Sequence, residues 1–279
     1  MKMKKIVVTL ALFLVLICGE AFAEITPTPN LIPIETALKK ADLNTLVIFD
    51  VNDVLITHKD QILQPEHKAD FKKLAREHEK RYSHEELQKL DSIISLSNPY
   101  EVVDIKSLQL IHNLQKRGIK VLALTKYMTG SFGNIPSLEN WRVGMLENFG
   151  YTFKNSWSTF KSKTFAELQS KDPKRFPVFK SGVLFTNGLT KGETLKAFLQ
   201  YADFSPEKII FIDNNRKYLE SVETFAKEAG IPFIGFEYTA IAARPKTPLD
   251  EKRARLQFEI LGKEHKWLND QEANLRENQ

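Results

Sequence analysis

Four polar side chains occupy positions from which they could act together on one substrate. Asp50, Thr125 and Asp213 each follow a short apolar run, and Lys191 opens a helical stretch. Open α/β sheets bind their ligands at the carboxyl ends of the strands. We therefore expect two carboxylates, a hydroxyl and a cation to converge at one edge of a sheet.

The chemistry that suits this set is phosphoryl transfer through a carboxylate. A phosphate ester is anionic and repels a carboxylate nucleophile, and Mg²⁺ between Asp50, Asp213 and a phosphate oxygen would remove that repulsion. Two aspartates with several waters match the ligands that Mg²⁺ prefers. Lys191 would neutralise a second phosphate oxygen, and Thr125 with loop N–H groups would hold a third. Asp50 could then form an aspartyl-phosphate.

The elements that must position these residues alternate along the chain. Five short, dense apolar runs read as buried parallel strands. They are Leu46–Phe49, Val121–Leu124, Val183–Phe185, Ile209–Ile212 and Pro232–Phe236. Helical patterns separate them at 105–117, 138–149, 191–201 and 216–229. This order predicts an α/β fold, a Rossmann-like core whose parallel sheet has helices on both faces.

Residues 58–100 interrupt the alternation with two polar helical stretches. Ser83 followed by Glu86 is a capping box that opens the second of them. A helical pair inserted after the first strand is typical of a small cap over an active site, and the alternative is a surface insertion without such a role.

The remaining segments complete the predicted organisation. The core comprises 41–57 and 101–246, and the helical cap comprises 58–100. Residues 24–40 are expected to form a lead-in, exposed over the proline-rich part at 25–34. A C-terminal helical extension at 247–279 is expected to pack back on the core.

The N-terminus has the pattern of a secretory signal peptide. A basic head at residues 2–5 precedes the apolar stretch Ile6–Cys18, and Ala21-Phe-Ala23 provides a cleavage site. The apolar stretch is shorter than the roughly 18 residues that a membrane span needs. We expect cleavage after Ala23, a periplasmic or secreted protein, and no membrane attachment afterwards. An uncleaved anchor is the alternative.

Composition excludes several classes of function. The chain is 42% hydrophobic and 27% charged, which is typical of a globular protein. Loss of the signal removes three lysines and one glutamate, so the net charge falls from +5 to +3, too little to suggest a nucleic-acid partner. The single cysteine, Cys18, leaves with the signal, which excludes disulfides and cysteine catalysis. The six histidines show no metal-ligand spacing.

The ordered set of motifs resembles the haloacid dehalogenase (HAD) superfamily over roughly residues 43–240. The first motif is Asp50-Val-Asn-Asp-Val after a strand, the second is Thr125, the third is Lys191 and the fourth is Asp213-Asn214. The layout of the chain and its ending, around Arg255-Leu-Gln-Phe-Glu and Trp267, are similar to a group of uncharacterised secreted HAD-like bacterial proteins.

The resemblance implies a role for each matching residue. Asp50 corresponds to the nucleophile and a metal ligand, and Asp213 to the second metal carboxylate. Asn52 stands where the backbone carbonyl binds the metal and the side chain normally acts as general acid and base. Thr125 and Lys191 correspond to the phosphate binders.

Asn52 departs from this pattern because an amide can neither donate a proton as an acid nor accept one as a base. General acid–base catalysis is worth about 10²–10⁴-fold, so alkyl phosphates should suffer more than aryl or acyl phosphates. Asp53 is a candidate substitute, although its side chain is expected to point elsewhere, as a surface or capping carboxylate. Asn214 also replaces an acid that the fourth motif often has.

Two functions follow from the sequence. The first is a secreted Mg²⁺-dependent phosphatase or phosphotransferase, weak because of Asn52, acting on a phosphorylated small molecule or phosphoprotein. The second is a catalytically impaired protein that binds a phosphorylated ligand or a protein partner. Dehalogenation needs no Mg²⁺, and Asp213 after an apolar strand argues against it.

Overall fold

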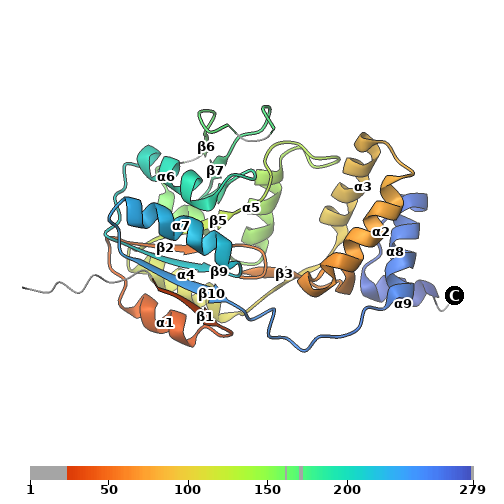
Figure 1. Ribbon diagram of the computed structural model, residues 1–279, viewed down its shortest axis with the longest axis horizontal. Helices are drawn as coiled ribbons and strands as arrows, with labels where there is room; N and C mark the ends of the chain where they lie inside the picture. The colour runs from red at the N-terminus through yellow and green to blue at the C-terminus, as the bar shows by residue number, and fades with distance from the viewer. Residues whose placement is uncertain (1–23, 161, 170–171, 278–279) are drawn as a thin grey trace, which may run out of the picture.

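The protein is a mixed α/β structure built on one large, mostly parallel sheet. The computed structural model describes residues 24–160, 162–169 and 172–277. Within them the sheet has eight strands in the order β1-β10-β9-β2-β5-β8-β7-β6, and the first six are parallel (Figure 1). Their bounds are β1 Glu24–Thr28, β2 Thr45–Phe49, β5 Lys120–Thr125, β6 Ser162–Thr164, β7 Val178–Lys180, β8 Val183–Phe185, β9 Lys208–Asp213 and β10 Phe233–Tyr238.

Helices cover both faces of this sheet, as the sequence predicts. Alternate residues of each strand point to opposite sides, so Val47 and Phe49 belong to one apolar core, while Leu46 and Ile48 belong to the other. The first core includes residues of three helices, α1 (Ile32–Lys39), α4 (Lys106–Lys116) and α5 (Leu138–Asn148). The second includes residues of α6 (Lys191–Tyr201) and α7 (Arg216–Glu228), which Figure 1 shows on the opposite side from α1 and α4.

The order of strands reverses at β2, which fixes where a ligand can bind. From β2 the chain continues to β5 and β8 on one side, and it then returns to β9 and β10 on the other. The crevice outside the carboxyl ends of strands at such a reversal is the usual ligand site of open α/β sheets. In this protein that crevice lies where β2 ends beside β9.

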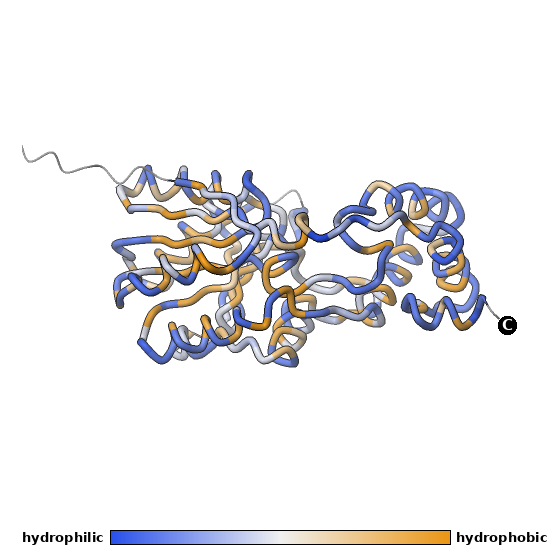
Figure 2. Tube along the Cα trace, turned by 90° about the horizontal axis from the view of Figure 1, so that it is seen from below, coloured by the Kyte–Doolittle hydropathy of each residue, from blue (hydrophilic) through white to orange (hydrophobic). Residues whose placement is uncertain are grey.

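Four helices form a separate lobe beside the sheet (Figures 1 and 2). They are α2 (Lys68–Glu79), α3 (His84–Ser97), α8 (Glu251–Glu264) and α9 (Asp270–Glu277). The Ser83–Glu86 capping box that begins α3 is present as the sequence predicts. Most of the lobe shares an apolar core of its own, formed by Ile62, Leu74, Leu90, Ile94, Ala254, Phe258, Leu261 and Trp267.

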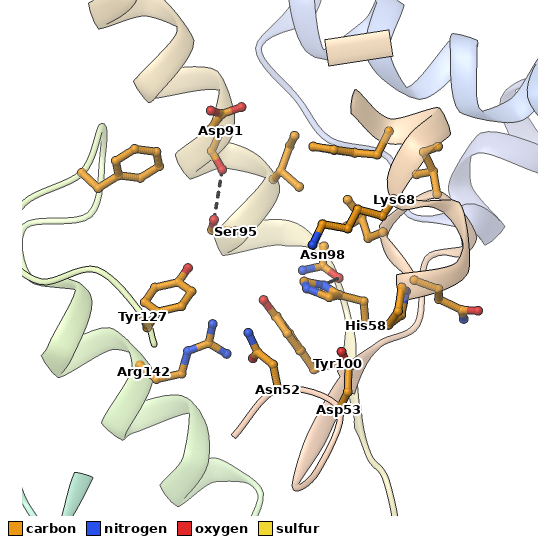
Figure 3. Close-up of a pocket in the computed structure, with 17 residues that line it drawn as sticks. Asn52, Asp53, His58, Lys68, Asp91, Ser95, Asn98, Tyr100, Tyr127 and Arg142 are labelled. Atoms are coloured by element: carbon orange, nitrogen blue, oxygen red, sulfur yellow. Dashed lines mark hydrogen bonds between the residues drawn. The ribbon is translucent and has the colours of Figure 1, made fainter. Parts of the chain in front are cut away.

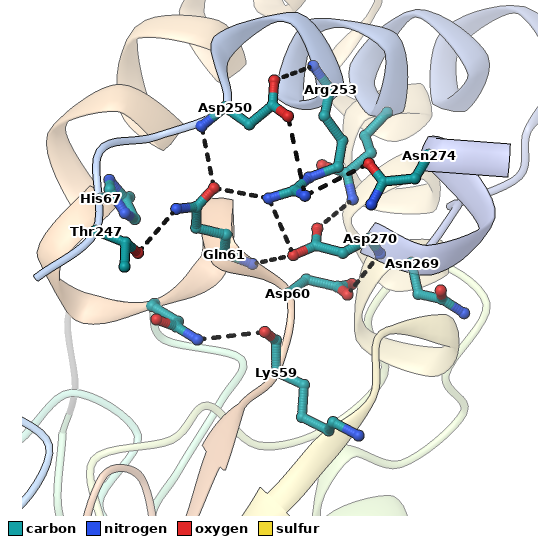
Figure 4. A network of polar contacts seen from close by, with 12 residues as sticks. Lys59, Asp60, Gln61, His67, Thr247, Asp250, Arg253, Asn269, Asp270 and Asn274 are labelled. Carbon is teal, nitrogen blue, oxygen red and sulfur yellow. Dashed lines mark hydrogen bonds and ion pairs between the residues drawn. The ribbon is translucent and has the colours of Figure 1, made fainter. Parts of the chain in front are cut away.

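A small antiparallel pair of strands links the lobe to the sheet. Strand β3 (Ile56–His58) leads into the lobe, and β4 (Tyr100–Val102) leads back. A polar network near the lobe's base joins its N-terminal and C-terminal parts (Figure 4). Buried Asp60 accepts hydrogen bonds from Trp267 Nε1 at 2.8 Å and from the Asp270 backbone N–H at 3.0 Å.

Two expectations from the sequence are wrong. Residues 25–34 are not simply an exposed lead-in, because β1 extends the sheet beside β10 and α1 begins at Ile32. The C-terminal extension does not pack back on the sheet, because α8 contacts α2 and α3 and completes the lobe. The inserted helices alone would leave their apolar stripes uncovered, and α8 covers them.

Candidate active site

The sheet brings two predicted carboxylates to one point. Strands β2 and β9 are parallel neighbours with Phe49 opposite Ile212, and the Asp50 backbone N–H donates to the Ile212 carbonyl at 2.9 Å. Asp50 directly follows β2, and Asp213 is the last residue of β9. The two side chains therefore lie at adjoining strand ends, inside the crevice where the strand order reverses.

Lys191 binds both carboxylates. Its Nζ lies 2.6 Å from Asp50 Oδ1 and 2.6 Å from Asp213 Oδ2, so those two oxygens are separated by at most twice that distance. Thr190 caps helix α6 by accepting from the Glu193 backbone N–H, which makes Lys191 the first residue of the helix. A cation is unfavourable at a helix N-terminus, and the two carboxylates compensate for that position.

Gly192 allows α6 to approach α7 closely behind this lysine. A Cβ atom at Gly192 would overlap the carbonyl oxygen of Ser221. The backbone N–H of Gly192 also donates to Ser221 Oγ at 3.2 Å. The close contact between α6 and α7 therefore fixes the position from which Lys191 extends.

The cluster carries an excess of negative charge in a buried setting. Asp213 is 0%, Lys191 1% and Asp50 6% exposed. With both carboxylates ionised, the two carboxylates and one ammonium sum to a net charge of −1, which burial makes costly. Burial raises the pKa of Asp213 to about 7, against the opposing effect of Lys191. Burial disfavours the charged lysine too, yet Asp213 and Asp50 hold the Lys191 pKa above its ordinary value.

The two carboxylates differ in their access to a substrate. The Asp213 side chain is closed to solvent, and its Oδ1 accepts the Asn215 backbone N–H at 2.8 Å. The Asp50 side chain is 8% exposed. Within the described part of the chain, the hydrogen-bond partner of the Asp50 side chain is Lys191. Asp50 is therefore the carboxylate that can meet a ligand.

A tight loop follows Asp50 and presents Asn52. The Asp53 backbone N–H donates to the Ile56 carbonyl at 2.7 Å, and Asp53 adopts a positive φ of 61°. Asn52 Oδ1 is buried without a hydrogen-bond partner. Its amide therefore has an acceptor available for a ligand.

Asp53 lies in the cavity wall and is not a surface carboxylate. Its Oδ1 accepts the Thr57 hydroxyl at 2.7 Å, and burial raises its pKa. The expectation that this side chain points away from the site was therefore wrong, since Asp53 and Asn52 line the same cavity.

Thr125 ends β5, the neighbour of β2 on the side opposite β9, and is buried. In the described residues no hydrogen bond joins its side chain to Asp50, Asn52 or Lys191. Thr186 follows β8, and its buried Oγ1 has no partner. The sequence reasoning missed Thr186, although it follows the apolar run 183–185 as Thr125 follows its own.

A cavity of about 500 Å³ lies between the sheet and the lobe (Figure 3). Asn52 and Asp53 contribute from the loop after β2, Tyr127 and Arg142 from the sheet side, and Lys68 from α2. Its volume falls within the roughly 300–1,000 Å³ of small-molecule sites. Asn52 and Asp53 of its wall belong to the loop that follows Asp50, while Asp50 itself is not among the described residues that line it.

The carboxylates of Asp50 and Asp213 suit a metal ion that takes only a few ligands from the protein and the rest from water. The described residues contain no group of three or more His, Cys, Asp or Glu side chains that could hold a metal. Asp50 and Asp213 nonetheless provide a buried excess negative charge, and Asn52 provides an unpaired carbonyl oxygen. Mg²⁺ is commonly bound by one or two carboxylates and several waters, which fits this set.

The fold and site define a mixed α/β protein with a buried carboxylate–lysine cluster at the reversal point of a mostly parallel sheet. The chain belongs to the family described as Protein of unknown function (DUF2608), which matches residues 27–274. This family is distinct from the haloacid dehalogenase superfamily, and the resemblance to that superfamily was wrong. The four short motifs that suggested it are each common in α/β proteins.

The chain is similar to several bacterial proteins. An uncharacterised protein of Rickettsia prowazekii is 25% identical over 95% of this chain and 96% of its own length. One from Rickettsia felis is 30% identical over 53% of this chain and 52% of its own. A Chlamydia trachomatis protein with the provisional name of outer membrane protein is 36% identical over 29% of this chain and 30% of its own. No solved structure matches the chain significantly.

The expected signal peptide, residues 1–23, lies outside the described residues. In the part of the chain that the structure describes, no helix has the length and apolar character to span a membrane.

Proposed function

We propose that the protein is a phosphoryl-transfer enzyme that uses Asp50 as its nucleophile. The observation that carries the proposal is the buried Asp50–Lys191–Asp213 cluster at the strand reversal, with Asp50 the member open to a ligand. Phosphoryl transfer depends on positioning and on stabilising negative charge, and a nearby fixed ammonium supports both.

The chain's own residues divide the work as follows. A carboxylate oxygen of Asp50 attacks phosphorus, the bond from phosphorus to the leaving oxygen breaks, and that oxygen takes the electron pair. Lys191 holds the attacking carboxylate in place at 2.6 Å, and Asp213 holds the lysine. Water then attacks the phosphorus of the aspartyl-phosphate, which releases phosphate and restores Asp50.

Mg²⁺ held by Asp50, Asp213 and an oxygen of Asn52 would neutralise charge on the bound phosphate. Asn52 orients a ligand by hydrogen bonding but cannot exchange a proton. Leaving groups that depart as stable anions, such as aryl oxides, therefore suit this site best.

The test is hydrolysis of an aryl phosphate with Mg²⁺. We expect Asp50→Asn to abolish turnover and Asn52→Asp to raise it by about 10²-fold or more, as a restored acid–base group should. Lys196→Met serves as the control, because it alters an exposed side chain of α6, the helix that carries Lys191, and it should leave the rate unchanged. Turnover that survives Asp50→Asn would refute the proposal.

A second candidate function is binding of a phosphorylated ligand without turnover, which the missing acid–base group at Asn52 favours. It predicts that inorganic phosphate raises the melting temperature in a manner that depends on Lys191, while aryl phosphates are not hydrolysed. Asp50-dependent turnover would exclude it.

We further propose an exported protein, periplasmic or secreted. The basic, apolar and small-residue order of residues 1–23 supports export, as does the similarity to a Chlamydia protein whose name refers to the outer membrane. Fractionation of cells that produce the full chain should place it outside the cytoplasm, with Glu24 as its first residue. Retention of residues 1–23 in the cytoplasmic fraction would contradict export.

A further inference from the structure

Arg142 of helix α5 is a buried cation without a counter-ion. It is 1% exposed, and the described part of the chain shows no ion pair to it. Its Nε has no hydrogen-bond partner, and its Nη1 reaches the sulfur of Met145 at 3.5 Å. Burying an unpaired charge is energetically costly, so such a residue needs compensation.

Aromatic rings supply part of that compensation. The guanidinium carbon lies 4.2 Å from the ring centre of Tyr127, 4.9 Å from Trp141 and 5.5 Å from Tyr100. Desolvated cation–π contacts stabilise the charge and hold the guanidinium plane in place. They leave Nε without an acceptor, and the planar fork of guanidinium donors matches a carboxylate or phosphate.

Among the described residues, no titratable group that lines the cavity forms an ion pair with Arg142. Burial raises the pKa of Tyr100, which keeps that phenol neutral. Burial lowers the pKa of His58 to about 4, so the imidazole is also neutral. Asp53 is hydrogen-bonded to Thr57. Asp91 of α3 also lines the cavity, and burial raises its pKa.

Arg142 points into the same cavity as Asn52 (Figure 3). Asn52 is two residues from Asp50, whereas Arg142 belongs to another element, so the two ends of a bound molecule can meet different groups. The cavity also offers apolar side chains, including Ile62, Phe71 and Phe132. This arrangement suits a small organic molecule with two anionic groups.

We infer that Arg142 binds a second anionic group of the ligand, a carboxylate or phosphate, apart from the phosphoryl group that reacts at Asp50. The identity of the first group rests on the proposed function, but the anion site at Arg142 does not. Arg142 thereby selects small organic phosphates with an additional negative charge.

The probes are phenyl phosphate and the three isomers of carboxyphenyl phosphate, with affinities measured by calorimetry in the Asp50→Asn background to prevent turnover. We expect at least one isomer to bind 10-fold or more tightly than phenyl phosphate. Arg142→Met should remove that preference, and Arg142→Lys should retain part of it. Lys196→Met, which alters an exposed cation of α6 outside the cavity, should leave the preference unchanged.

Equal affinity for all four probes, no binding of any, or a preference that survives Arg142→Met would overturn the inference. Urea unfolding of each variant establishes that it is folded, and Arg142→Lys serves if Arg142→Met is not. Failure of the proposed function has a different signature: aryl phosphate turnover independent of Asp50, with the Arg142-dependent preference intact.

Discussion

Lys191→Met tests the electrostatic structure of the candidate site most severely. The substitution keeps an unbranched side chain of similar length but removes two charged hydrogen bonds of 2.6 Å. Breaking a buried ion pair by removing one partner costs roughly 3–5 kcal/mol. Part of this cost is repulsion between Asp50 and Asp213, which at about 5 Å and an effective dielectric constant near 20 is roughly 3 kcal/mol.

The cost should also depend on pH. Burial already raises the folded-state pKa of Asp213 above 3.8, so its protonation stabilises the folded protein at low pH, and this contribution is lost as the pH rises through about 7. Without the lysine, which opposes the effect of burial, the pKa of Asp213 rises further. The free energy of unfolding of Lys191→Met should therefore lie further below the wild type at pH 8.5 than at pH 5.5.

Urea denaturation at the two pH values measures both effects. Lys196→Met, on the exposed face of the same helix, should change the free energy of unfolding by less than about 0.5 kcal/mol at either pH. A loss below about 1 kcal/mol for Lys191→Met, equal at the two pH values, would refute the buried charge cluster.

Two further predictions concern the elements that support the site. Gly192→Ala should lower the free energy of unfolding by roughly 1–3 kcal/mol, because the added Cβ overlaps the Ser221 carbonyl. Gly144→Ala, which places its Cβ in open space on α5, should be neutral or stabilising. Thermal melts of the two variants compare these effects. Burial raises the pKa of Asp60 to about 6, above its ordinary 3.8, so its contribution to the free energy of unfolding should fall by roughly 2 kcal/mol as the pH rises from about 4 to 6. Asp60→Asn should remove that part of the pH dependence in urea titrations, and an unchanged profile would contradict the prediction.

The central strands could be predicted from the sequence because parallel strands buried on both faces are short apolar runs. Strand β1 could not, because an edge strand needs no such run and Pro27 and Pro29 suggest a loop. The antiparallel strands β6 and β7 have three residues each, too few for a periodic pattern. The contact of α8 with the inserted helices depends on tertiary packing that no local signal records.

The candidate site could be predicted in part. Asp50, Lys191 and Asp213 were found because strand ends and helix starts converge in any open α/β sheet. The sequence indicated Lys191 as a phosphate binder, and the structure adds that it pairs with both carboxylates. Arg142 was missed because an arginine inside a helix usually lies on the solvated face, and its burial depends on aromatic residues distant in sequence.

The most direct measurement is chemical trapping of the covalent intermediate. During turnover of an aryl phosphate with Mg²⁺, borohydride reduces an aspartyl-phosphate to homoserine, which peptide mass spectrometry locates. We predict homoserine at position 50, none at position 213 and none in Asp50→Asn. Turnover with no reduced residue at position 50, or reduction at another carboxylate, would contradict Asp50 as the nucleophile.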